Sequence, residues 1–147
     1  MDVRRRSVLA SVLLGLLSKS ARARTDSAEE PVFASLVQLI ATPERFDGKL
    51  VRVAGFCRLE YEGTVLYLDK ESFEAALPLH GVWLDVEWPI PEKYRPLTDT
   101  YVMVDGRYGA PKPGGRALHA GRLSPITAMV RHRTRAEIEG ALRLGRG

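Results

Sequence analysis

The clearest pattern in the chain is an alternation of apolar and polar residues in two segments, 50–59 and 99–108. This two-residue period is typical of a β-strand that is buried on one face. Both segments place a glycine after two alternating valines, and a glycine inside a strand permits a sharp bend or a bulge. The two segments therefore predict long strands that curve around a shared core. In the first of them the apolar face consists of Val51, Val53, Gly55, Cys57 and Leu59.

Three further segments also predict strands: TVLYLD at 64–69, GVWLDVE at 81–87, and residues 117–129. Pro125 lies inside the last of these and must interrupt it or place it at a sheet edge, because proline has no N–H to donate. The segment 88–97 contains three prolines, which exclude a central strand and predict a loop with one helical turn. The sequence thus predicts five strands.

Helical spacing appears before the first strand. Phe33, Leu36, Val37 and Ile40 recur at the spacing of one helix face. Because the residue before a proline avoids helical angles, Pro43 should end this helix near Ala41.

Two shorter helical segments are also expected. Residues 70–80 predict a helical turn capped near Ser72. Near the C-terminus, Thr134 and Glu137 have the spacing of a capping box, which predicts a short basic helix there.

The order of these elements predicts a mainly β fold: a small five-stranded OB-like Greek-key barrel with an N-terminal helix and a short C-terminal helix. The stretch SLVQLIATPERFDGKLVRVAGFCRLEYEGTVLYLDKE (35–71), followed by GVWLDV and YVMVDGRY, resembles uncharacterised bacterial exported proteins with an OB-fold-like domain. The resemblance covers about half of the chain and is most specific around FDGKLVRVAGF. It implies the fold and no particular activity.

The N-terminal residues have the pattern of a secretory signal peptide. Three arginines precede an apolar run at 7–17, and Ala21 and Ala23 form a small-x-small cleavage site. The run has 11 residues, whereas a membrane-spanning helix needs roughly 20. Residues 5–9 also resemble a twin-arginine export signal. We therefore expect a periplasmic or secreted protein with no stable membrane span after cleavage. The twin-arginine route is one hypothesis for its export.

The predicted organisation has four parts. Residues 1–23 are the signal peptide, 24–31 a spacer, 32–130 the OB-like barrel domain and 131–147 a basic C-terminal tail. The leader carries five basic groups and one acidic group, so the formal net charge of +4 comes from it alone. Residues 24–130 hold 12 basic and 15 acidic groups. Because nucleic-acid binders gain affinity from clustered Lys and Arg, this balance makes a nucleic-acid partner unexpected.

No residue pattern specifies a reaction, a metal or a cofactor. His80, His119 and His132 are isolated from one another and have no zinc-ligand spacing. A Gly-x-Ser-x-Gly nucleophile motif is also missing from the sequence. Cys57 is the only cysteine, and we interpret it as a small core residue, with a functional thiol as the alternative.

Three acidic residues lie at the predicted ends of strands. Asp69, Asp85 and Glu87 could gather into a patch that binds a cation or assists acid–base chemistry. The simpler interpretation is a solvated rim.

Aromatic residues in and beside the strands give the candidate ligand site. Since Val82 and Leu84 should face inward, Trp83 should face outward, where it could stack on a base or a sugar. The alternative is that the N-terminal helix or the loop at Trp88 covers it. In OB folds the face of the second and third strands holds the ligand. The candidate ligand-binding residues are therefore Arg52, Arg58, Tyr67 and Trp83.

The sequence thus predicts an exported, non-enzymatic OB-like binding or interaction module whose ligand or protein partner it does not identify. The alternative is a single-stranded nucleic-acid-binding protein that uses the barrel face and the basic tail at 131–147. A third hypothesis is a small hydrolase that uses Asp85 and Glu87.

Overall fold

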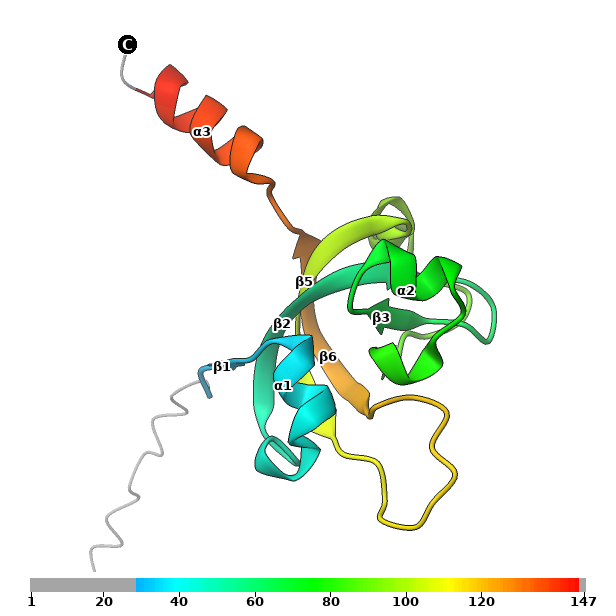
Figure 1. The fold of residues 1–147 in the computed structure, drawn as a ribbon. Coiled ribbons are helices and arrows are strands. Elements are labelled where there is room, and N and C mark those ends of the chain that lie inside the picture. The colour runs from blue at the N-terminus through cyan, green and yellow to red at the C-terminus, as the bar shows by residue number, and fades with distance from the viewer. Residues whose placement is uncertain (1–28, 146–147) are drawn as a thin grey trace, which may run out of the picture.

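Five strands close into a barrel in the computed structural model, which describes residues 29–145 (Figure 1). Strand β2 pairs with β3 on one side and β5 on the other, β3 pairs with β4, β4 runs parallel to β6, and β6 returns to β5. This order confirms the mainly β, OB-like Greek-key barrel. Its strands are β2 (Leu50–Arg58), β3 (Val65–Tyr67), β4 (Gly81–Leu84), β5 (Thr100–Gly109) and β6 (Arg122–Arg131).

The inward alternation of β2 and β5 is as predicted. Apolar side chains of β2, β5 and their neighbours are fully buried inside the barrel. Because the side chains of a strand alternate between its two faces, the same strands expose their polar residues outward. The centre of the core contains Val51, Val53, Cys57, Leu66, Val82, Leu84, Val102, Val104, Tyr108 and Leu123.

The N-terminal segment differs from the sequence prediction at its start. Val32–Phe33 forms a short strand, β1, that runs parallel to β2, so the assignment of Phe33 to the helix was wrong. Helix α1 (Leu36–Ala41) begins after Ser35, whose side chain and that of Gln38 form a reciprocal capping box. The helix ends before Pro43, as expected, and buries Leu36 and Leu39.

The remaining helices are short. Helix α2 (Lys70–Glu74) and the 3-10 turn η2 (Pro78–His80) connect β3 to β4, and η3 (Glu92–Leu97) precedes β5. A further 3-10 turn, η1 (Pro43–Arg45), follows α1, and α3 (Arg135–Leu144) lies near the C-terminus. The predicted cap near Ser72 is formed by Asp69, whose carboxylate accepts the Ser72 N–H. Thr134 and Glu137 cap α3 as predicted.

Strand β6 passes through Pro125 and continues to Arg131, but its register with β5 shifts twice between Asp105 and Tyr108. The proline thus disturbs the ladder without ending the strand. The predicted signal peptide at 1–23 lies outside the described residues. Within residues 29–145, every helix is too short or too polar to cross a lipid bilayer.

Candidate functional site

The face that would hold a ligand in an OB fold is partly covered by the chain itself. Phe56 and Tyr67 face outward from β2 and β3, and the Phe73 ring of α2 packs on them with centroid distances of 6.0 and 5.5 Å. Figure 1 shows α2 lying over β3. The predicted ligand residue Tyr67 is therefore half-buried beneath α2, and burial raises the pKa of its hydroxyl.

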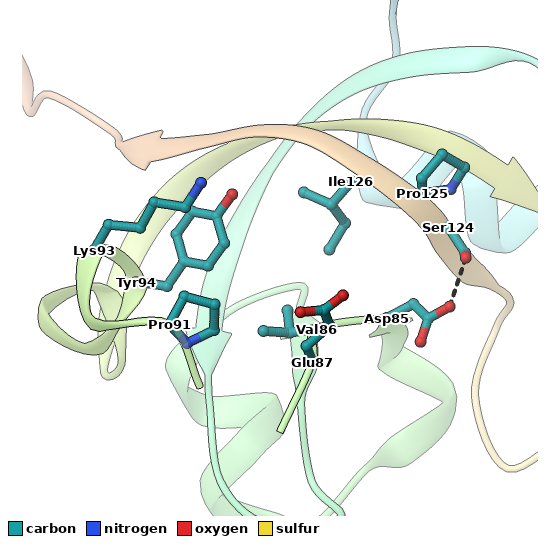
Figure 2. A pocket seen from close by; sticks show the side chains of 9 residues that line it. All are labelled: Asp85, Val86, Glu87, Pro91, Lys93, Tyr94, Ser124, Pro125 and Ile126. Carbon is teal, nitrogen blue, oxygen red and sulfur yellow. Dashed lines mark hydrogen bonds between the residues drawn. The ribbon is translucent and has the colours of Figure 1, made fainter. Parts of the chain in front are cut away.

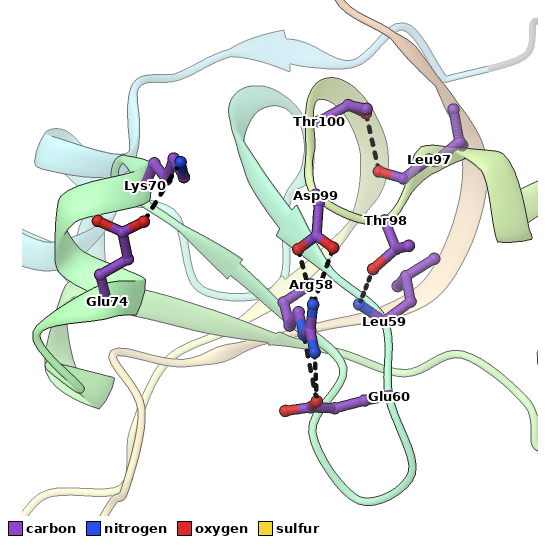
Figure 3. A network of polar contacts seen from close by, with 9 residues as sticks. All are labelled: Arg58, Leu59, Glu60, Lys70, Glu74, Leu97, Thr98, Asp99 and Thr100. Carbon is purple, nitrogen blue, oxygen red and sulfur yellow. Dashed lines mark hydrogen bonds and ion pairs between the residues drawn. The ribbon is translucent and has the colours of Figure 1, made fainter.

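Arg58, the second predicted ligand residue, lies at the edge of this cover. Its guanidinium sits 5.1 Å from the centre of the Phe73 ring. It donates hydrogen bonds to Asp99 at 2.8 Å and to Glu60 at 3.0 Å (Figure 3). Two carboxylates thus surround one cation, so little positive charge remains for an anionic ligand.

Arg52, the third predicted residue, lies elsewhere on the outer surface, where β2 meets β5. Its Nε and Nη2 donate to the two carboxylate oxygens of Asp105 at 2.7 and 2.6 Å. The guanidinium also stacks on the Phe33 ring, 5.4 Å from its centre. A bidentate pair with a nearly buried carboxylate holds this side chain firmly. The structure does not bring Arg52 and Arg58 to a common site with Trp83.

Trp83 lines an open cleft that includes none of the other predicted ligand residues. Its ring faces outward from β4, half-buried, and contacts the His119 ring at a centroid distance of 5.6 Å. The loop 110–121 partly covers the Trp83 ring. The Trp88 loop does not, because the Trp88 ring packs on Tyr61 at a centroid distance of 5.2 Å. Burial lowers the pKa of His119, which favours its neutral imidazole. The Trp83 cleft measures about 310 Å³ and is lined by Trp83, Gly109, Ala110, Pro111, Ala117, His119, Gly121 and Arg122.

A buried tyrosine fixes the end of the loop that carries His119. The Tyr108 hydroxyl donates to the Ala120 carbonyl at 2.6 Å and lies 3.2 Å from the Leu39 carbonyl. Gly121 has a φ of +126°, and a Cβ there would lie 2.6 Å from the Tyr108 ring. Only glycine allows this close approach. The backbone N–H of Trp83 donates to the Gly121 carbonyl at 2.9 Å, so strand β4 and the loop are joined directly at the cleft.

A second cleft opens where β4 and β6 separate. Their parallel pairing stops at Leu84 and Leu123, where β4 ends, and the segment after β4 and strand β6 then line a hollow of about 510 Å³ (Figure 2). Asp85 accepts hydrogen bonds from the Ser124 hydroxyl and from Arg122. We call this hollow the seam cleft; its lining residues are Asp85, Val86, Glu87, Pro91, Lys93, Tyr94, Ser124, Pro125 and Ile126.

The two clefts meet at one ion pair. Arg122 lines the Trp83 cleft, Asp85 lines the seam cleft, and their side chains are 3.0 Å apart. Of the three acidic strand-end residues, Asp85 and Glu87 therefore share a cleft. Asp69 does not join them because it caps α2, where hydrogen bonds from Ser72 lower its pKa.

Few reactive side chains lie close to one another in the described residues. In the range 29–145 we find no group of three His, Cys, Asp or Glu side chains arranged to hold a metal ion. Ser72 Oγ lies 3.2 Å from His80 Nδ1, but Ser72 is a buried residue of α2 and lines neither cleft. Cys57 is fully buried, and this burial, with a smaller effect of Asp99, raises its pKa to about 12. The interpretation of Cys57 as a core residue is confirmed.

The sequence predicted Trp83 as a ligand residue but did not predict the residues that surround it in the structure. In the sequence His119 appeared isolated, because Trp83, whose ring it contacts in the structure, is distant along the chain. Tyr108 appeared as a strand aromatic, with no sign that its hydroxyl would anchor a loop. The glycine at 121 was the one available signal, since a glycine directly before a strand often allows a close backbone approach.

Comparison with known proteins adds little on function. No protein-family model matches the chain, and a search of curated proteins returns no match. A search of solved structures returns a candidate aspartyl-tRNA synthetase from Leishmania major Friedlin, with 15% sequence identity and a TM-score of 0.39. The alignment covers 77% of this chain and 23% of that one. A likeness at this level carries no argument about activity.

Proposed function

We propose that this chain is an exported, non-enzymatic OB-like binding module whose ligand is held in the Trp83 cleft. The observation that carries the proposal is the pairing of an outward-facing Trp83 with His119 beside an open cleft of about 310 Å³. Small-molecule sites range upward from roughly 300 Å³ and combine aromatic surface with a few polar groups. This cleft fits that description.

The lining of the cleft suggests the class of ligand. The indole of Trp83 offers a flat apolar face, which favours a sugar ring or an aromatic heterocycle. Arg122 is exposed at the edge of the cleft and forms an ion pair with Asp85, so it can donate a further hydrogen bond to a polar substituent of the ring. The volume suits a ligand of one or two rings. The cleft also lies between a barrel strand and the loop that joins the last two strands, a region where OB folds bind ligands.

The charge distribution favours this proposal over single-stranded nucleic-acid binding. Arg52 and Arg58 are each neutralised by carboxylates, and in the tail Arg131 and Arg135 pair with Glu137 and Glu139. A strand of nucleic acid requires a row of available cations along its backbone.

Fluorescence of a single tryptophan tests the site directly. A Trp88→Phe variant leaves Trp83 as the only tryptophan, so a change in emission reports on this cleft. We would titrate it with panels of monosaccharides, disaccharides, nucleosides and short oligonucleotides. Saturable quenching by a small ring compound, abolished by an added Trp83→Leu substitution, is the expected result. Leu118→Asp in the same loop, whose side chain is exposed and is not among the lining residues, serves as the matched control.

Two outcomes would contradict the proposal. If none of the ring compounds changes the Trp83 emission, the cleft is not the ligand site. If instead oligonucleotides bind tightly and the affinity falls steeply with salt, nucleic-acid binding is the better function. Export is tested separately by the mass of the protein recovered from a bacterial host, which should begin at Arg24. An intact Met1 in the cytosol would contradict export.

A further inference from the structure

The loop 110–121, which forms one wall of the Trp83 cleft, carries positive charge and no negative charge. It contains Lys112, Arg116 and His119 but neither aspartate nor glutamate. Figure 1 shows this loop, in yellow and orange, projecting between the end of β5 and the start of β6. Lys112 and Arg116 are both exposed. The ion pairs formed among the described residues involve neither of them, so carboxylates of the described chain do not neutralise these two cations.

A tight turn places the two cations near each other at the edge of the cleft. The Gly115 N–H donates to the Lys112 carbonyl at 3.1 Å, and the ends of such a turn lie within about 7 Å of each other. Lys112 directly follows Pro111, and Arg116 directly precedes Ala117. Pro111 and Ala117 both line the cleft. Two long cationic side chains therefore begin at its edge, where they can reach a bound ligand.

The second half of the loop adds hydrogen-bond donors on the same side of the cleft. The backbone N–H groups of residues 116–119 donate to no backbone carbonyl in the described part of the chain. Ala117 and His119, within this segment, line the cleft. Backbone N–H groups carry partial positive charge and bind the oxygens of carboxylates and phosphates. The loop thus offers an anion both full charges and directed donors.

The acidic groups near the cleft are engaged by other partners. Asp85 pairs with Arg122 at 3.0 Å and accepts a hydrogen bond from the Ser124 hydroxyl. Asp47 accepts the Ala110 N–H at 2.9 Å at the start of the loop. The residues that line the cleft include one arginine and one histidine but no carboxylate. The charge presented to a ligand in the cleft is therefore positive.

We propose that the ligand of the Trp83 cleft is an anionic ring compound, whose ring lies against the indole and whose carboxylate or phosphate group is bound by Lys112 and Arg116. This inference rests on the proposed function and adds the charge of the ligand to it. Stacking on the indole does not distinguish a neutral ring from a charged one, since both offer an apolar face. The two cations supply that distinction. A pair of cations suits one anionic group, whereas a nucleic-acid strand requires a longer row of them.

The test compares compounds that share a ring and differ in charge. In the Trp88→Phe chain, quenching of Trp83 emission would give dissociation constants for glucose, glucuronate and glucose 6-phosphate, and for uridine and uridine 5′-phosphate. Within the set that binds, a charged compound should bind ~10-fold more tightly than the neutral one at low salt, because an exposed ion pair changes an equilibrium by up to about fivefold. This preference should shrink between about 0.01 M and about 1 M salt, since salt screens exposed charges.

Substitutions in the loop test the source of the preference. Lys112→Gln and Arg116→Gln should each lower the ratio of the charged to the neutral affinity by about threefold, and the double variant should bring it close to one. A purely structural effect would weaken both compounds alike and leave the ratio unchanged. Lys93→Gln is the matched control, because it removes the same charge from an exposed side chain of the seam cleft and should leave the ratio as it is.

The outcomes separate this inference from the proposed function. If neutral and charged compounds quench with equal affinity, the inference is overturned and the proposed function stands. A preference that persists in the double variant also overturns the inference, since other groups then bind the anion. If no compound quenches, the proposed function is overturned together with the inference. Either order of glucuronate and glucose 6-phosphate, both ahead of glucose, supports the inference and identifies the preferred anionic group.

Discussion

Gly55 of β2 is packed tightly against α1 and β3, so a larger side chain at this position should destabilise the barrel. A Cβ added there would lie 2.6 Å from Leu36 Cδ1, 2.6 Å from the Tyr67 carbonyl oxygen and 2.8 Å from Leu66 Cγ. Carbon atoms in contact are normally about 3.5–4.0 Å apart. Leu36 can rotate away, but the Tyr67 oxygen belongs to the backbone of β3. The two strands would therefore have to move apart where Phe56 pairs with Tyr67.

The expected effect of Gly55→Ala follows from these contacts. Overpacking a core costs about 1–3 kcal/mol, and three simultaneous overlaps place this site at the upper end of that range. Alanine also restricts the unfolded chain, which offsets about 0.4–1 kcal/mol. We expect a net loss of about 2 kcal/mol, which would lower the urea midpoint by about 1 M for a typical small domain. Far-UV circular dichroism in urea measures this.

Gly140→Ala is the matched control for the same substitution. Gly140 lies in α3, and a Cβ added there would have nothing within 4 Å. Alanine is also the better helix former, so this variant should be at least as stable as the wild type. If Gly55→Ala unfolds within about 0.5 kcal/mol of the wild type, which is the scatter of ordinary surface changes, the close approach of α1, β2 and β3 at this glycine is wrong.

Three further predictions concern titratable side chains. Tyr108→Phe should lower the free energy of unfolding in urea by about 1–3 kcal/mol, because it leaves buried carbonyl groups without their donor. An unchanged free energy would show that the Tyr108 hydroxyl does not anchor the loop. Cys57 should resist a thiol reagent until the chain unfolds, and because its pKa rises from 9.0 to about 12 on folding, it contributes stability that is complete below pH 9 and is lost toward pH 12. In the Trp88→Phe variant, Trp83 emission should fall as pH drops through a midpoint below 6.5, since burial lowers the pKa of His119. An added His119→Gln substitution should remove that change.

The fold was largely predictable because its signals are local. The alternation in residues 50–59 and 99–108 fixes which side chains face inward, and that period is a property of the strand itself. The end of α1 before Pro43 and the cap of α3 at Thr134 are likewise set by residues a few positions apart. The start of α1 was mispredicted because Phe33 fits a helical period, whereas the pairing of β1 with a distant strand decides its conformation.

The candidate site, in contrast, was decided by the tertiary structure. Nothing in the sequence near Arg52 or Arg58 indicates that Asp105 and Asp99 would neutralise them, because those carboxylates come from distant segments. The cover of Phe73 over Tyr67 depends on how α2 folds back on β3. The sequence alone determined the strands and the inward face, since periodicity records local geometry. Which outward residues stay open to a ligand depended on long-range contacts, and a periodic pattern contains no information about those.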